Sequence, residues 1–518
     1  MKRIALVLAA LALPVALRAG EARDVRVTVA GSVDPTSRET IVKSFMREGM
    51  TDEARAIALW RAILTRMYHY ANSGGDNWDM LCTYGCSLCG TMWRVTAWLA
   101  NDPAALGPGN AGGGGLGKWF QDPPTRYRTM KGWLLDSYLL GRKPLSALDA
   151  APTEGGSSQG GHTMGSFFFD GRSHFMDPMA GFYVYTADGD HIASLSEIAS
   201  DPSLVTDPVR TSEPFMPCDA GAPHFFYRPR GGSGGKGKPI AAGPAHPIHL
   251  RAGMQYIRYY GRTFPDAFKL PDGWKKSYDE AYWDRGPRHV CDRGKGPRHY
   301  GNGEVVFEPR ADSPWKAAFV SAENVAADLE GGLHAADPGK GFSFTLEFAT
   351  PHIFPSGRIT AAAGGPGSIE LLLPDRSGKP GTPVTVWSLA TGGTGKAPLD
   401  VGLTPHLRAK CPRSFRLRFR MEKNARLAGL RASGIFQYNY FMAPCLAPGE
   451  NRVAVAWGGT AEAVKVTWRW REKGAAGKEH VHLARASGET YAVAVGGVGP
   501  SKWAPDPTFV DCMILEAR

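Results

Sequence analysis

From residue 246 to the C-terminus, the chain is a series of short segments in which apolar and polar residues alternate. The clearest of these segments are residues 343–349, 368–373, 384–387, 414–420, 452–457 and 464–470. Alternation with a period of two is typical of strands that bury one face. Many short strands separated by polar turns favour β-sandwiches. We therefore expect residues 246–518 to form a β-sandwich region, with one or two modules.

The N-terminus has the layout of a secretory signal peptide. Met1-Lys2-Arg3 is positively charged, residues 4–17 are almost wholly apolar, and small residues follow, with cleavage sites after Ala19 or Ala22. The apolar run falls short of the ~20 residues that a membrane-spanning helix needs, and no later segment is apolar enough to span. The sequence predicts a signal peptide at 1–22, no membrane span, and a secreted or periplasmic protein.

A chain of 518 residues is too long for a single hydrophobic core, so we expect a multidomain protein. Residues 228–245 are rich in Gly, Pro, Ser and Lys and are typical of a linker or long loop. This segment divides the mature chain into a domain at 23–227 and the β-sandwich region at 246–518.

The first of these domains contains both helical and strand patterns. Thr51 precedes two acidic residues and apolar residues at helical spacing, which predicts a helix from 52 to about 70. A second helix is expected to begin near Cys89. Strands at 162–169 and 173–176 flank the dipeptide Asp170-Gly171, a strong signal for a β-hairpin. We therefore expect both helices and strands in this domain.

Three residues in this domain suggest nucleophilic chemistry. A cysteine reacts as its thiolate, which a nearby histidine and a helix N-terminus stabilise, and a third group orients the histidine. Cys89 lies at the expected start of a helix, His162 lies at the start of the hairpin, and Asp177 lies at its end. Because the two arms of a hairpin are antiparallel, we expect His162 and Asp177 to be neighbours.

The segment from Gly161 to Pro178, with its Gly-His, Asp-Gly turn and terminal Asp-Pro, resembles the second half of a bacterial transglutaminase-like domain. The Tyr-Gly-x-x-x-Cys-Gly segment around Cys89 resembles that family's nucleophile motif. This resemblance implies a multidomain α+β protein with a papain-like α+β core, in which Cys89 is the nucleophile, His162 the base and Asp177 the orienting acid. It implies no metal and no cofactor.

The segments 301–309 and 436–451 resemble exported bacterial proteins in which such a domain is joined to jelly-roll-like β-sandwiches. This second resemblance implies an architecture and no particular activity.

The cysteines leave other interpretations open. There are eight of them, at positions 82, 86, 89, 218, 291, 411, 445 and 512. The spacing of Cys82, Cys86 and Cys89 is also that of iron–sulfur enzymes, and it is compatible with a zinc site or with a disulfide between Cys82 and Cys86. His174 is the alternative to His162 as the histidine of the site, but we expect His174 to face solvent on its strand. No oxyanion-hole donor stands out; the backbone N–H of Cys89 and the side chain of Trp78 are the candidates.

The formal net charge of +11 is compatible with an acidic partner, such as an acidic polysaccharide, the cell wall or a phospholipid surface, and equally with a basic surface that has no specific partner. No nucleic-acid motif is visible. Alternating arginines at 416, 418 and 420, grouped with basic residues at 288, 293, 295 and 298, could bind an acidic glycan or could simply form the wet face of a strand. Three functions follow. The first is a cysteine-dependent peptidase, amidase or transglutaminase acting on a protein, a peptide or an amide-containing cell-wall substrate. The second is a vestigial domain in a carbohydrate- or surface-binding protein, and the third is a structural partner in an exported assembly.

Overall fold

The computed structural model describes residues 20–69, 76–87, 89–100, 166–177, 182–194, 197, 200–201, 203–206, 209–210, 248–260, 300–310, 313–328, 332–375, 381–390, 396–407, 410–472, 477–496 and 509–518. Several predictions concern segments outside the described residues. These are residues 1–19 of the signal peptide, His162, the linker at 228–245 and the basic residues between 288 and 298.

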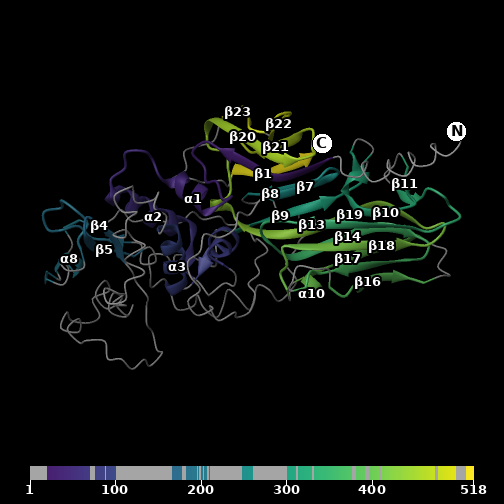
Figure 1. Cartoon of the computed structure of the whole chain (residues 1–518), viewed down its shortest axis with the longest axis horizontal. Helices are drawn as coiled ribbons and strands as arrows, with labels where there is room; N and C mark the ends of the chain where they lie inside the picture. The colour runs from purple at the N-terminus through teal and green to yellow at the C-terminus, as the bar shows by residue number, and fades with distance from the viewer. Residues whose placement is uncertain are drawn as a thin grey trace, which may run out of the picture.

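β-strands make up most of the described chain (Figure 1). The predicted α+β class with a papain-like core is therefore wrong for this protein, whose architecture is dominated by a β-sandwich region. The prediction gave too much weight to the helical patterns near Cys89. The strands in the rest of the chain are longer and pair over long sequence distances.

A five-stranded antiparallel sheet forms one layer of the sandwich. Its strands, in spatial order, are β10 (Phe319–Glu323), β13 (Phe342–Ala349), β18 (Ser414–Met421), β15 (Gly367–Leu372) and β16 (Val384–Leu389). The alternating segments at 343–349, 368–373, 384–387 and 414–420 all lie in this sheet. The predictions of strands there are confirmed.

A ten-stranded sheet forms the largest layer. Its main path runs through β11 (Val325–Ala327), β12 (Leu333–Ala335), β19 (Arg426–Asn439), β9 (Tyr300–Phe307), β8 (Met254–Tyr259), β24 (Val510–Ala517), β21 (Val464–Trp470) and β22 (Lys478–Ala484). Off this path, β14 (Ile353–Gly364) pairs with β19 and with β17 (Lys396–Gly402).

A four-stranded sheet joins the two ends of the chain. Its order is β23 (Glu489–Val495), β20 (Gly449–Gly459), β1 (Glu21–Val29) and β7 (Ile248–Arg251). The N-terminal strand β1 thus lies between two strands of the region after residue 246, and its Val25, Val27 and Val29 are buried.

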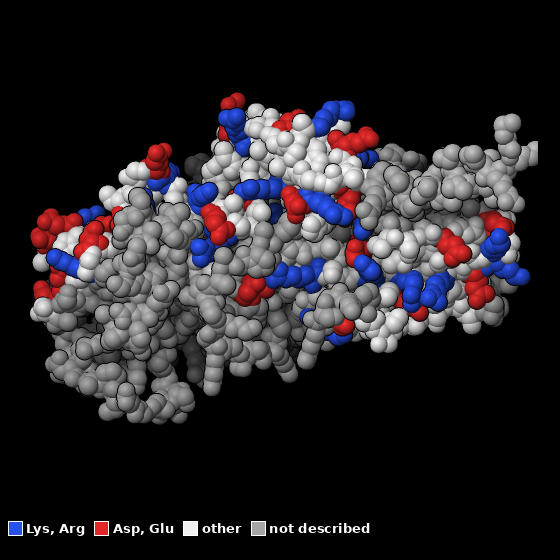
Figure 2. All heavy atoms as spheres, in the orientation of Figure 1, with Lys and Arg blue, Asp and Glu red and all other residues white. Residues whose placement is uncertain are grey.

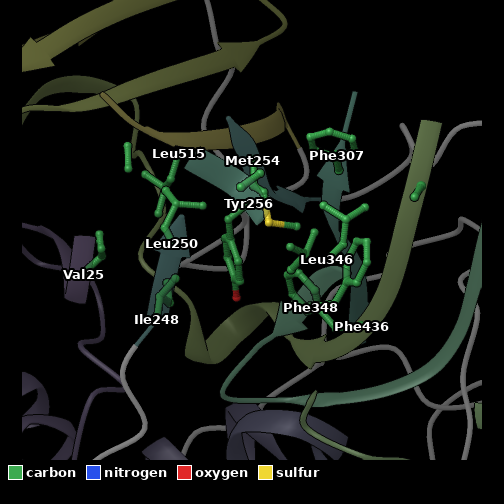
Figure 3. Packing of buried hydrophobic residues seen from close by; sticks show 14 of the residues in the cluster. Val25, Ile248, Leu250, Met254, Tyr256, Phe307, Leu346, Phe348, Phe436 and Leu515 are labelled. Atoms are coloured by element: carbon green, nitrogen blue, oxygen red, sulfur yellow. The ribbon is translucent and has the colours of Figure 1, made fainter. Parts of the chain in front are cut away.

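The three large sheets share one hydrophobic core (Figure 3). Phe354 of β14 and Phe415 of β18 meet edge to face with ring centroids 5.1 Å apart, so the ten- and five-stranded sheets pack together there. Trp468 of β21 donates its indole N–H to the hydroxyl of Tyr491 in β23 at 3.1 Å, which connects the ten- and four-stranded sheets. The ten-stranded sheet therefore packs against each of the other two sheets.

The helical region lies beside one end of the sandwich (Figure 1). It contains α1 (Arg38–Phe45), α2 (Asp52–Arg66), the π-helix η1 (Asp79–Tyr84) and α3 (Cys89–Ala100). Two small sheets accompany these helices: the parallel pair β2 (Tyr68–His69) and β3 (Cys86–Ser87), and the antiparallel β4 (Ser166–Phe169), β5 (Arg172–Asp177) and β6 (Phe182–Tyr183). Short elements complete the described chain: α8 (Ser203–Thr206), α10 (Thr404–Leu407), η4 (Trp315–Ala318) and η5 (Tyr440–Met442).

The two predicted helices are confirmed, with one change of boundary. The side chain of Thr51 accepts a hydrogen bond from the backbone N–H of Ala54 and caps α2 as expected. The helix ends at Arg66, earlier than predicted, because the chain then enters the short strand β2, which pairs with β3. Helix α3 begins at Cys89. No helix in the described part of the chain combines the length and the apolar character needed to cross a membrane.

Candidate functional site

Cys89 is the first residue of α3, a helix of 12 residues. The chain reaches it from η1 through Gly85, which adopts a left-handed conformation, and then through strand β3. The pairing of β3 with β2, the strand that follows α2, connects this segment to the rest of the helical region. A helix N-terminus carries a partial positive charge that favours the thiolate over the thiol. The start of α3 at Cys89 is therefore compatible with the predicted nucleophile, whose role stays a prediction.

The predicted hairpin is present. Its arms β4 and β5 are joined by Asp170 and Gly171, whose φ angles of 49° and 74° are both positive, as a tight two-residue hairpin turn requires. Asp177 is the last residue of β5, where it pairs with Phe182 of β6. The backbone of Asp177 therefore lies at the end of the second arm, and its role as an orienting acid stays a prediction. Its predicted partner, His162, lies outside the described residues.

Helix α2 brings the Cys89 helix and the Asp177 strand together. Buried residues of α2, α3, β4 and β6 belong to one hydrophobic cluster, distinct from the sandwich core; among them are Leu59, Ile63, Met92, Val95, Phe167, Phe169 and Tyr183. Trp60 of α2 packs edge to face on Tyr183, with ring centroids 4.9 Å apart. Tyr183 follows directly after Phe182, the residue that pairs with Asp177. The helix starting at Cys89 and the strand ending at Asp177 are thus packed on the same helix.

The π-helix η1 precedes the Cys89 segment and is almost completely buried. Its N-cap residue, Trp78, is 2% exposed and donates its indole N–H to the carbonyl of Pro35 at 2.7 Å. Because that hydrogen bond occupies the indole donor, Trp78 does not serve as an oxyanion donor here. π-Helical turns are rare and occur frequently at functional sites.

A charged residue of η1 pairs with a residue of the sandwich region. The carboxylate of Asp79 accepts a hydrogen bond from the guanidinium of Arg413 at 2.7 Å. Burial raises the pKa of the Asp79 carboxyl to about 6, and the nearby Arg413 only partly opposes that shift. Thr83, one turn further on, lies 3.1 Å from Nδ1 of His352, a buried residue of the sandwich region. Trp78 stacks on the same imidazole with ring centroids 5.2 Å apart.

Two amide side chains of β19 also reach the helical region. Asn439 donates from Nδ2 to the carbonyls of Leu81 and Arg66, both at 2.7 Å. Gln437 donates to the carbonyl of Thr83 at 3.4 Å. Both amides are fully buried. Analysis of the sequence missed these residues, although polar residues inside the aromatic run 436–441 are a signal for buried hydrogen bonds.

The other described thiols differ from a nucleophile. Cys82 is buried and free, so the interpretation of a Cys82–Cys86 disulfide is wrong. Burial raises the pKa of the Cys82 thiol well above its ordinary value, and it raises that of Cys512 to about 11. Among the described side chains, no group of three or more His, Cys, Asp or Glu residues is placed to hold a metal ion.

His174 is buried, which corrects the expectation of a solvent-facing residue. Only 2% of it is exposed, its ring stacks on Phe169 with centroids 3.8 Å apart, and its Nδ1 lies 2.5 Å from the carbonyl of Ile192. Burial lowers the pKa of this imidazole, which favours the neutral ring. These contacts assign His174 a structural role in the hairpin.

The arginines of β18 are paired with acids of the neighbouring strands. Arg416 lies opposite Glu347 of β13 at 2.7 Å, and Arg418 lies opposite Glu370 of β15 at 2.5 Å. Arg420 is 3.8 Å from Glu370. Figure 2 shows basic and acidic residues interspersed over the sandwich. Cross-strand ion pairs of this kind support the interpretation of a wet strand face over that of a glycan site.

No family model and no curated protein sequence matches this chain. Among solved structures, it is similar to a β-glucuronidase from Ruminococcus gnavus in complex with N1-substituted uronic isofagomine. That structure has 11% sequence identity and a TM-score of 0.13, with 32% of each chain covered. The same enzyme in complex with D-glucuronic acid has 11% identity and a TM-score of 0.11, with 29% of this chain and 31% of that chain covered.

The chain thus spans about a third of the length of the enzyme that it matches. TM-scores this low do not indicate a common fold, so no activity is transferred from that enzyme.

Proposed function

We propose that this protein is an exported, transglutaminase-like enzyme that acts on amides, with Cys89 as nucleophile, His162 as general base and Asp177 as the acid that orients the histidine. The proposal rests on one observation: Cys89 is the first residue of α3, and α3 packs on the same helix, α2, as the hairpin that ends at Asp177. The proposal concerns the chemistry of this site and assumes no papain-like fold.

The reaction would proceed in two balanced steps. The Cys89 thiolate attacks the amide carbonyl carbon, the C–N bond breaks, and the amine leaves with a proton from the His162 imidazolium. This step leaves a thioester on Cys89. Water or a second amine, deprotonated by His162, then attacks the thioester and releases the thiolate. Water as acceptor makes the protein a peptidase or amidase, whereas an amine makes it a transglutaminase.

The experiment is alkylation of the reduced protein by iodoacetamide at neutral pH, followed by peptide mapping to resolve each cysteine. Cys89 should react faster than Cys411, a partly exposed thiol that serves as an internal reference. His162→Ala should bring the rate at Cys89 down to that of the reference, because the thiolate then loses its imidazolium partner. Ordinary reactivity of Cys89 in the wild-type protein would contradict the proposal.

The same experiment separates the enzyme from the two alternative functions. A vestigial domain and a structural partner both leave Cys89 as an ordinary thiol. Binding of an acidic glycan by a Cys89→Ala variant, together with unexceptional thiol chemistry in the wild type, would favour the binding protein instead.

A further inference from the structure

The π-helix η1 is held in place by side chains of the sandwich region. Carbonyl groups in the last turn of a helix lack intrahelical donors, and when they are buried they need partners from elsewhere. Here the carbonyls of Leu81 and Thr83 receive N–H groups from Asn439 and Gln437, which lie more than 350 positions away in the sequence. Two backbone carbonyls at the end of η1 thus take their hydrogen bonds from the sandwich.

Asn439 connects three segments with one side chain. One N–H of its amide serves η1 at Leu81, and the other serves the last turn of α2 at Arg66. Its carbonyl oxygen accepts from the backbone N–H of Phe441 at 3.2 Å and so caps η5. Both donors and one acceptor site are used, and the residue is fully buried, so its geometry is closely determined.

The residues around Asn439 strengthen the same connection. Met442, at the end of η5, belongs to the hydrophobic cluster of the helical region, although it follows a sandwich strand in sequence. Arg413 pairs with Asp79 near the surface, and His352 lies against Thr83 in the interior. The contacts on η1 therefore extend from a buried centre at Asn439 to a partly exposed rim at Arg413.

The proposed nucleophile follows η1 directly. Only Gly85, strand β3 and Leu88 separate η1 from Cys89, and β3 pairs with the strand that follows α2. Asn439 hydrogen-bonds to α2 and to η1. These two helices directly precede the paired strands β2 and β3 in the chain. A displacement of η1 would therefore be transmitted to the start of α3.

We infer that the segment Gln437 to Met442 is a clamp that positions Cys89, and that Asn439 is its central positioning residue. This inference rests on the proposed function for the role of Cys89. The sandwich is then part of the catalytic scaffold, and it is more than an appended binding module. The clamp accounts for the aromatic and amide run at 436–442, to which the proposed reaction assigns no chemical role.

The test uses the full chain and two isosteric variants. Asn439→Asp keeps the shape and the cap on η5 but loses both donors to Leu81 and Arg66. Asn451→Asp is the matched control, because Asn451 is also buried, donates to the carbonyls of Ala447, Gly449 and Val493, and accepts from a backbone N–H, all within the sandwich. Two readouts are measured: amide hydrogen exchange of peptides from residues 79–100, and the rate of Cys89 alkylation.

Asn439→Asp should accelerate exchange across residues 79–100. It should also slow Cys89 alkylation by about tenfold, since a misplacement of the order of 1 Å can cost about a hundredfold in rate. Asn451→Asp should accelerate exchange in β20 and β23 and leave the alkylation rate unchanged. Unaltered exchange across 79–100 in Asn439→Asp, or equal effects of the two variants on Cys89, would overturn the inference.

A milder pair covers the case in which Asn439→Asp fails to fold. Arg413→Gln removes the rim contact to Asp79. Arg358 is about as exposed as Arg413 and pairs inside the sandwich with Asp400, a more exposed acid than Asp79; Arg358→Gln removes that pair. Arg413→Gln alone should change exchange and alkylation at residues 79–100; no change there would count against the clamp. If wild-type Cys89 reacts as an ordinary thiol, the proposed function fails, while the exchange data still decide whether the clamp holds this segment.

Discussion

The carboxyl group of Asp79 is buried in an environment that destabilises its charged form. It is 6% exposed, and its folded-state pKa is about 6, compared with an ordinary value of 3.8. A raised carboxyl pKa means that the folded protein binds the proton more tightly than the unfolded chain. The associated stability is therefore fully present below pH 3.8 and is lost as the pH rises through about 6. The shift corresponds to about 3 kcal/mol.

Asp79→Asn should remove this pH dependence. Relative to the wild type, the free energy of unfolding of the variant should improve as the pH rises from 4 to 7, because the variant has no carboxylate to ionise. Loss of the pair with Arg413 shifts the whole curve but does not change its slope. Urea unfolding at a series of pH values measures the difference. Parallel curves for the variant and the wild type would refute the prediction.

The start of β1 restricts the site of signal-peptide cleavage, if the protein is exported as proposed. Ala22 is fully buried and pairs with Gly459 on one side and Leu250 on the other, whereas the carbonyl of Gly20 still accepts from Ala252 at 2.6 Å. Cleavage after Ala22 would remove the first two residues of the strand. Intact-mass measurement of the exported protein should therefore place the new N-terminus at Gly20. An N-terminus at Arg23 would contradict this.

At the scale of single elements, the hairpin turn tests how local sequence determines structure. Gly171 has a φ of 74°, and nothing lies within 4 Å of the position that a Cβ would take. Gly171→Ala should therefore destabilise the hairpin by about 1 kcal/mol through backbone strain alone. The control is Gly364→Ala, where space is also open but φ is not positive. Hydrogen exchange in β4 and β5 measures the effect of Gly171→Ala, and exchange in β14 measures that of Gly364→Ala; equal destabilisation by the two variants would exclude strain as the cause.

Elements with local signals could be predicted from the sequence. The cap at Thr51, the dipeptide at 170–171 and the alternating segments all specify structure through neighbours in the chain. The positions of Cys89 and Asp177 at an element start and an element end followed from those signals. The π-helix at 79–84 did not, and two of its backbone carbonyls accept hydrogen bonds from side chains of β19, a contact that leaves no local signal in the sequence. The burial of His174 also depends on a distant partner, Ile192.

At the scale of the whole molecule, β1 makes the sandwich discontinuous in sequence. The strand lies between β20 and β7, so a fragment starting at residue 246 lacks an internal strand of the four-stranded sheet. The sequence pattern alone did not indicate this pairing, because register over more than 400 positions leaves no local trace. The error in fold class has the same origin: long-range pairing determined the architecture, and local helical patterns did not.

A fragment of residues 246–518 should consequently be much less stable than the full chain. Loss of β1 exposes the surfaces that cover Val25, Val27 and Val29, each worth about 1.5–3 kcal/mol when fully buried. It also leaves unpaired strand edges that promote aggregation. Adding a peptide of residues 20–30 should raise the melting temperature of the fragment. A fragment as stable and soluble as the full chain would contradict this account.

Cys89 is the proposed nucleophile, and His162 and Asp177 are the groups proposed to activate it. The most direct measurement is a pH titration of thiolate ultraviolet absorbance, taken as the difference between the wild type and Cys89→Ala. One thiolate should persist well below the ordinary thiol pKa of about 8.5. This thiolate should disappear in His162→Ala, weaken in Asp177→Asn, and remain in Asp170→Asn, a control in the hairpin turn. A Cys89 that titrates near 8.5 in the wild type, and equally in all three variants, would contradict the account.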